Sequence, residues 1–212
     1  MGLMATDKGG SDFEPISQGL HHAICNGLYD LGTQFNETFG NWSHKVLICW
    51  ELPEERIDIE KDGQKLNLPR ATSKRYTLSL GEKANLRKDL ETWRGKAFTA
   101  QELSGFDVKN ILGKNCLLQI IHRTKGDKTY ANVSAVMPLM KGTSSKESEN
   151  PIRYFAFGDS NEIPEGVPEW ITKEIQASKE WKARSANPSD PSEADSLPPV
   201  ESYDVPEDDI PF

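Results

Sequence analysis

Basic and aromatic side chains occur close together in three stretches of this sequence, a combination suited to binding a single nucleic acid strand. Residues 61–128 carry fifteen Lys and Arg against seven Asp and Glu, a local excess of eight positive charges. Lys and Arg neutralise phosphate groups, and aromatic rings stack on unpaired bases. The sequence therefore predicts a surface that binds single-stranded DNA. The candidate contacts are Trp42, Lys45, Trp50, Arg70, Lys74, Arg75, Tyr76, Arg123, Lys125, Lys128 and Tyr130.

Two of the aromatic candidates have an alternative role in the core. Tyr76 falls on the same side of its expected strand as Leu78, and Trp50 falls on the same side as Ile48. Successive residues of a strand face opposite ways, so core packing competes with base stacking for both rings. Arg75 lies on the polar side of its strand and is the stronger candidate for a phosphate contact.

The sequence contains no motif typical of an enzyme. A P-loop, a GxGxxG turn and an HExxH helix are all absent, and the adjacent His21 and His22 would point to opposite faces of a strand. Cys25, Cys49 and Cys116 lie far apart and include no CxxC pair, so neither a zinc site nor a disulfide framework is predicted. We therefore expect a protein without catalytic residues, cofactor or metal. A metal-dependent nuclease built from scattered acids is the enzymatic alternative.

Charge is distributed unevenly along the chain. The net charge is −8, but residues 185–212 contain eight acids and no Lys or Arg, which leaves residues 1–184 neutral. This acidic segment is also rich in Pro and Ser and poor in large apolar residues, so it cannot bury enough apolar area to fold. We expect residues 185–212 to be disordered. The last five, "DDIPF", end on an apolar aromatic side chain.

The first half of the chain reads as three strands. Apolar residues on both sides of 20–35 predict a strand buried on both faces. The Gly- and Asn-containing stretch 32–42 predicts a loop, which carries three aromatic residues. A second strand is expected over 43–52, ended by Pro53. Alternation around an Asp-Gly pair at 62–63 then predicts a hairpin that leads into a third strand over 70–80.

The second half begins with a helix. Leu86, Leu90 and Trp93 recur at helical spacing before Gly95, a typical C-terminal stop. Thr99 and Glu102 have the spacing of a capping box at the start of a further short helical segment. The later elements expected are strands over 116–123 and 130–139 joined by a tight turn, a possible sixth strand over 152–158, and a helix over 167–184 with Pro168 near its start.

The expected order is three strands, a helix and two strands, without the strand and helix alternation of a parallel sheet. This order resembles the oligonucleotide-binding (OB) fold, a mainly β, five-stranded Greek-key barrel with a helix between the third and fourth strands. Another small β-sandwich is the alternative. The predicted organisation is a flexible N-terminus at 1–16, the OB domain at 17–160, a helical segment at 161–184 and the acidic tail at 185–212.

With this layout, the ending "DDIPF" resembles the C-terminal tip of bacterial single-stranded DNA-binding proteins. The long N-terminus, the long second hairpin arm and the extra helix are most similar to the divergent members from tailed bacteriophages. The resemblance implies that the tip docks replication, recombination and repair enzymes. It also takes Phe212 to be the true C-terminal residue. The docking residues would be Asp208, Asp209, Ile210, Pro211 and Phe212.

These features predict a non-enzymatic protein that coats and protects single-stranded DNA in replication, recombination and repair. A strand-annealing or recombination mediator with the same groove is the alternative binding function. No stretch approaches ~20 consecutive apolar residues and the N-terminus lacks an apolar signal, so we expect no membrane association and a cytoplasmic location. The resemblance to phage proteins implies that this is the cytoplasm of the bacterial host. The resemblance leaves self-association open, because that family includes monomers, dimers and tetramers.

Overall fold

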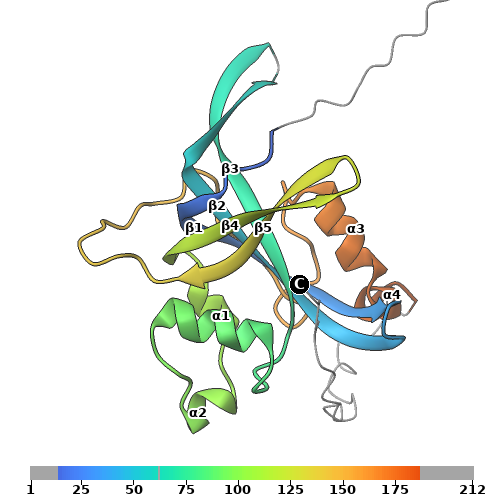
Figure 1. Ribbon diagram of the computed structural model, residues 1–212. Helices are drawn as coiled ribbons and strands as arrows, with labels where there is room; N and C mark the ends of the chain where they lie inside the picture. Colours follow the sequence, from blue (N-terminus) through green and yellow to red (C-terminus); the bar gives the residue numbers. More distant parts are fainter. Residues whose placement is uncertain (1–13, 62, 187–212) are drawn as a thin grey trace, which may run out of the picture.

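The structure is a computed structural model that describes residues 14–61 and 63–186. It is mainly β: five antiparallel strands curl into a half-barrel, and a few helices pack around it (Figure 1). A sixth, short strand pairs in parallel with the first. The strands are β1 (Gly19–Asn36), β2 (Asn41–Lys61), β3 (Gln64–Thr77), β4 (Asn115–Lys125), β5 (Lys128–Met137) and β6 (Arg153–Phe155).

The strand order across the sheet is β3-β2-β1-β4-β5. This order and the helix between β3 and β4 are compatible with an OB-like fold, as the sequence predicted. A closed barrel would also require β3 to pair with β5. Within the residues that the structure describes, no such pairing occurs. The half-barrel is therefore open along a seam between these two strands.

The predicted loop over 32–42 was wrong in its extent. β1 continues to Asn36 and β2 already begins at Asn41, so only a four-residue turn separates them. The prediction that Pro53 ends the second strand was also wrong. The β2–β3 pairing skips from Leu52 to Arg56, and the strand resumes beyond this irregularity. Because proline has no N–H to donate to a ladder, a bulge is where a strand tolerates it.

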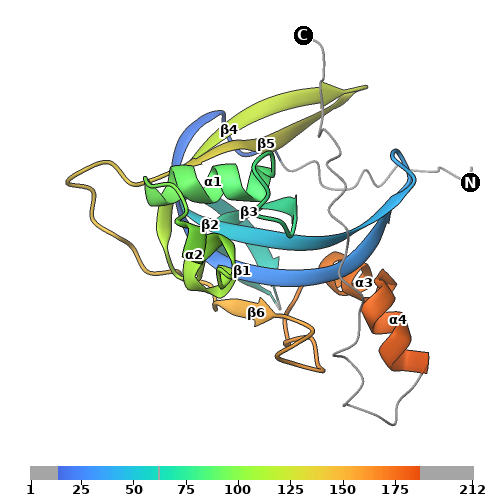
Figure 2. The ribbon, with the colours of Figure 1, turned by 90° about the horizontal axis from the view of Figure 1, so that it is seen from below.

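The helix between β3 and β4 is confirmed. α1 (Asn85–Arg94) buries Leu86, Leu90 and Trp93 and ends at Gly95, whose φ of 67° lies in the left-handed region. Two short elements follow: α2 (Ala100–Leu103), with the predicted capping box between Thr99 and Glu102, and a 3₁₀ helix, η1 (Val108–Ile111). α1 packs against β5 and β3 and so covers one end of the half-barrel (Figure 2).

A second layer covers the outer face of the sheet. Tyr29, Leu31 and Leu47 point outward from β1 and β2 and pack with Phe155 of β6 and with buried isoleucines of the C-terminal helices. The predicted single helix is two helices, α3 (Glu169–Ala177) and α4 (Lys179–Ala186). Ser178 separates them because its hydroxyl accepts from the Trp181 N–H and donates to the Ile175 carbonyl. A capping serine thus starts a new helix where periodicity alone predicted continuation.

The residues just before β1 pack against the sheet. Ile16 is buried, and its carbonyl oxygen lies 2.7 Å from Nε2 of His122 on β4. The carbonyl of Glu14 accepts from Arg70 on β3 at 2.6 Å. Glu14 and Ile16 are therefore held against the sheet. Both precede residue 17, where the sequence predicted the start of the domain.

Glu51 is a fully buried carboxylate on β2. Its oxygens accept hydrogen bonds from the backbone N–H groups of Glu149 and Asn150, both at 2.8 Å. The Asn150 side-chain amide and the Ser148 hydroxyl also donate to it, at 2.6 and 3.0 Å. One acidic side chain thus fixes the long connection between β5 and β6 onto β2.

Gly32 on β1 is the point where the α3–α4 junction approaches the sheet most closely. Its φ is +65°, and a Cβ there would lie 2.5 Å from Oε2 of Glu180 and 2.7 Å from Cβ of Ser178. We expect Gly32→Ala to lower the free energy of unfolding by about 2 to 4 kcal/mol, because it combines backbone strain with overpacking. Chemical denaturation measures this change.

Gly40, in the β1–β2 turn, provides the matched control for Gly32. Its φ is +63°, but a Cβ there would meet no atom within 4 Å. Gly40→Ala should therefore show only the backbone cost, about 1 to 2 kcal/mol. Equal losses in the two variants would contradict the close packing of α3 and α4 on β1.

Candidate nucleic-acid interface

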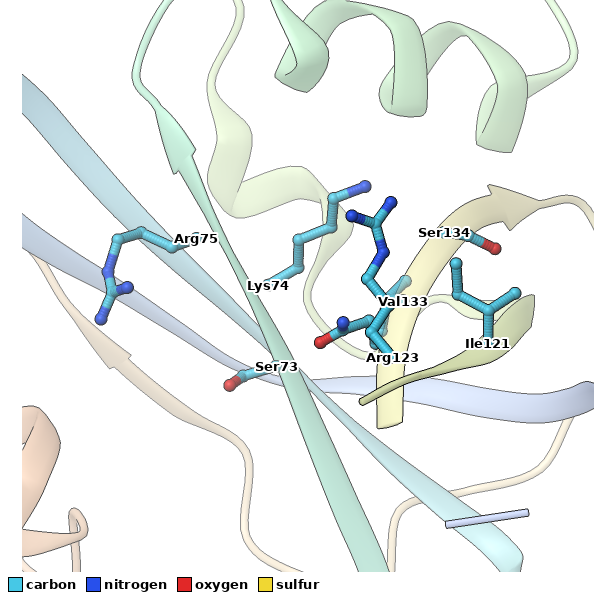
Figure 3. A pocket seen from close by; sticks show the side chains of 8 residues that line it. Ser73, Lys74, Arg75, Ile121, Arg123, Val133 and Ser134 are labelled. Atoms are coloured by element: carbon cyan, nitrogen blue, oxygen red, sulfur yellow. The ribbon is translucent and has the colours of Figure 1, made fainter. Parts of the chain in front are cut away.

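The open seam between β3 and β5 contains a cavity of about 450 Å³. Residues from β3, β4 and β5 line this cavity, and three of them are cations that were predicted from the sequence to contact DNA. Figure 3 shows these side chains from close by. The lining residues are Ser73, Lys74, Arg75, Ile121, Arg123, Asn132, Val133 and Ser134.

Lys74 and Arg123 extend toward the same side of the seam, although they belong to different strands (Figure 3). Lys74 donates to a carboxylate oxygen of Asp89 on α1 at 2.7 Å, and this pair is half-buried. Arg123 is exposed and forms no ion pair with any residue that the structure describes. Among the three cations that line the cavity, Arg123 is therefore the one whose charge no described residue neutralises.

Arg75 points away from Lys74, to the other side of β3 (Figure 3). Its guanidinium forms an ion pair with Glu174 of α3 at 2.6 Å. The prediction that Arg75 lies on the polar side of its strand is confirmed, since half of its side chain is exposed. Nothing in the sequence indicated that Glu174, 99 residues away, would be its partner.

Two hairpins project from the same side of the half-barrel, one from β1–β2 and one from β4–β5 (Figures 1 and 2). The β1–β2 hairpin carries Phe35, Phe39 and Trp42, each exposed by nearly half. Phe35 and Trp42 contact each other, with ring centroids 5.1 Å apart. The two phenylalanines were not among the predicted contacts, although their place in the aromatic stretch 32–42 was the signal that could have included them.

The β4–β5 hairpin carries the remaining exposed candidates. Lys125 and Lys128 face each other at its tip, and Tyr130 lies opposite Arg123 with nearly half of its surface exposed. Neither lysine forms an ion pair within the described ranges 14–61 and 63–186. This arm therefore offers two free cations and an aromatic ring on the same side as the aromatic β1–β2 hairpin.

Trp50 and Tyr76 lie in the core, so the structure contradicts their prediction as base-stacking residues. Trp50 is completely buried and packs against Trp93, and Tyr76 is 3% exposed. The Tyr76 hydroxyl donates to Asp89, and burial, followed by the charge of Asp89, raises its pKa. Both side chains point into the half-barrel, so neither aromatic ring is accessible to a base.

Two further predicted cations contact neighbouring protein groups. Lys45 donates from Nζ to the Thr77 hydroxyl at 2.7 Å, and Arg70 donates to the Glu14 carbonyl. Both side chains are partly buried. The structure thus brings Lys74 and Arg123 together on one side of β3 and places Arg75 on the other side, whereas Lys45 and Arg70 lie outside the seam. The predicted docking residues 208–212 lie outside the described residues.

His44 is the titratable group at the junction of β2 with the second layer. Its Nε2 lies 2.6 Å from Oδ1 of Asp30, and this hydrogen bond is the main cause that raises the pKa of His44 above 6.5, with a further contribution from Glu180. The protonated form is therefore favoured in the folded state. Its stabilisation is fully present below about pH 6.5 and is lost as the pH rises through the folded pKa.

We expect the wild-type protein to lose its stability advantage over His44→Gln as the pH rises from about 6.5 through the raised pKa of folded His44. Glutamine can still donate to Asp30 but carries no charge. Denaturation midpoints of both proteins across this range measure the difference. A difference that stays constant or grows with pH would contradict the charged contact.

The described residues contain no group of three His, Cys, Asp or Glu that could hold a metal ion. In the same part of the chain, no helix is both long and apolar enough to cross a membrane. No family model matches the sequence, and no curated protein is significantly similar to it.

Proposed function

We propose that this protein binds single-stranded DNA without sequence preference and protects it during replication, recombination and repair. The observation that carries the proposal is the open seam, where cations from β3 and β4 surround one cavity between two projecting hairpins. A single strand presents a phosphate at every nucleotide and unpaired bases between them. The seam supplies positive charge, and the hairpins supply exposed aromatic rings.

The proposal includes the finer fold assignment. The strand order and the position of α1 support an OB fold whose barrel is open between β3 and β5. In OB folds, the face of the second and third strands and the loops joining strands one to two and four to five bind oligonucleotides. Those loops correspond here to the two hairpins with exposed aromatic and basic residues.

The proposal also assigns partner docking to residues 208–212, on the evidence of their sequence. Phe212 offers an aromatic anchor, and the preceding acids offer a charge that steers the peptide toward a basic-rimmed pocket. The resemblance of this tip to phage single-stranded DNA-binding proteins supports a proposed location in the cytoplasm of an infected bacterium. Its partners would be enzymes that process single strands.

Titration of the full chain with poly-dT tests DNA binding. Trp42 is exposed on the β1–β2 hairpin, Trp50 and Trp93 are buried, and the exposed Trp170 lies on α3, outside the two hairpins. Quenching of tryptophan fluorescence should therefore be smaller in Trp42→Phe than in the wild type. The apparent affinity should fall as salt rises, in proportion to the phosphates neutralised. Absence of binding, or equal affinity for duplex DNA, would overturn the proposed function.

Deletion of residues 204–212 tests the docking function separately. The shortened chain should bind poly-dT at least as tightly as the full chain, because it has lost acidic residues. It should no longer recover the replication and repair enzymes that the full chain captures. Equal recovery by both chains would refute docking through the tip.

A further inference from the structure

The α3–α4 pair places charged groups on two residues of the proposed DNA site. Glu174 pairs with Arg75, with 2.6 Å between Oε2 and Nη2. Lys179, five positions further along, places its Nζ 3.9 Å from the centroid of the Trp42 ring. Both contacts use side chains that a single strand would need, one for a phosphate and one for a base.

The chemistry of each contact matches the ligand that it would exclude. A carboxylate against a guanidinium uses the same hydrogen-bond donors that would bind a phosphate oxygen. An ammonium over an aromatic face occupies the surface on which a base would stack. The two helices therefore present substitutes for both parts of a nucleotide.

Buried side chains and hydrogen bonds to β1 hold both helices against the sheet. Ile171 and Ile175 are buried against the sheet, and Glu180 accepts hydrogen bonds from the backbone N–H and hydroxyl of Thr33 at 2.7 and 2.5 Å. The carbonyl of Glu174 accepts from the Gln34 amide at 2.9 Å, which fixes its backbone beside β1. Because the backbone of Glu174 is fixed, its carboxylate, which is 20% exposed, would leave Arg75 by rotation of the side chain alone.

We propose that Glu174 acts as a built-in competitor for DNA at Arg75. In the free protein its carboxylate occupies the position of a phosphate, and single-stranded DNA binds by displacing it. This competitor belongs to the folded α3 helix. The inference rests on the proposed function and adds to it a contact that lowers affinity.

Glu174→Gln tests the inference, and Glu169→Gln is its matched control. Glu169 lies on the same helix, is 80% exposed and pairs with Lys173 at its i+4 position, so the control removes one negative charge away from Arg75. At low salt, Glu174→Gln should raise poly-dT affinity about two- to fivefold, the range expected for loss of a partly exposed ion pair. Glu169→Gln should leave the affinity unchanged.

A double-mutant cycle with Arg75→Gln separates competition from a general charge effect. In the Arg75→Gln background, Glu174→Gln should give no gain, because the competed group is absent. An unchanged or lower affinity of Glu174→Gln, or an equal gain without Arg75, would overturn the inference. Thermal unfolding of Glu174→Gln, Glu169→Gln and Arg75→Gln shows whether each variant folds. A wild-type chain that binds no DNA overturns the proposed function instead.

Discussion

Reversal of charge at Arg123 should weaken binding to poly-dT by at least about tenfold at low salt. Arg123 is the exposed guanidinium of the seam and has no ion-pair partner among the described residues, so Arg123→Glu both removes a phosphate contact and repels the strand. The slope of log affinity against log salt should fall by about one. Fluorescence anisotropy of a labelled dT oligomer across salt concentrations measures both quantities.

Lys65→Glu is the control for Arg123→Glu. Lys65 is an exposed lysine on β3, at the far end of the β2–β3 hairpin and outside the seam. The same charge reversal there should change affinity by less than about twofold, because exposed charges beyond a Debye length are screened. Equal losses in the two variants would show that only the net charge of the protein matters and that the seam is not a binding site.

Removal of the buried carboxylate of Glu51 should have the largest effect on stability. Glu51→Ala leaves the N–H groups of Glu149 and Asn150 and the amide of Asn150 without their acceptor. Loss of several charge-assisted hydrogen bonds should lower the free energy of unfolding by about 3 to 5 kcal/mol. Chemical denaturation measures the loss.

Two further variants show whether the hydrogen bonds of Glu51 are responsible. Glu51→Gln keeps the size and one acceptor oxygen, so it should lose about 1 to 2 kcal/mol. Glu54→Ala removes an adjacent carboxylate that is exposed and pairs with Lys146 at the surface, and it should cost less than about 1 kcal/mol. A Glu51→Ala loss no larger than that of Glu54→Ala would contradict the anchoring role.

The sequence predicted the order of elements well because each depended on a local pattern. The helical spacing of Leu86, Leu90 and Trp93, the Gly95 stop and the Thr99–Glu102 capping box all occur where expected. Strand ends were less predictable. β2 passes Pro53 because a bulge accommodates it, and Ser178 divides the C-terminal helix because its side chain caps the next one.

The candidate site was predictable only as a region. The alternation of side chains along β3 correctly placed Arg75 on the outer side. For Trp50 and Tyr76 it allowed either core packing or base stacking. Both rings are buried because the sheet curls around them. The sequence shows three aromatic residues within 32–42, but it does not show that they lie on a hairpin with exposed rings. That conformation depends on the pairing between β1 and β2. Local composition does not report such a pairing.

By itself, the sequence determined the mainly β architecture, the place of α1, the basic centre and the acidic end, because periodicity, capping and charge are properties of neighbouring residues. Only the tertiary structure decided that β3 and β5 do not pair within the described residues, that Lys74 and Arg123 line one cavity, and that Glu174 reaches Arg75. Those contacts join residues about 50 to 100 positions apart, so they depend on how the sheet curls and where the last helices pack.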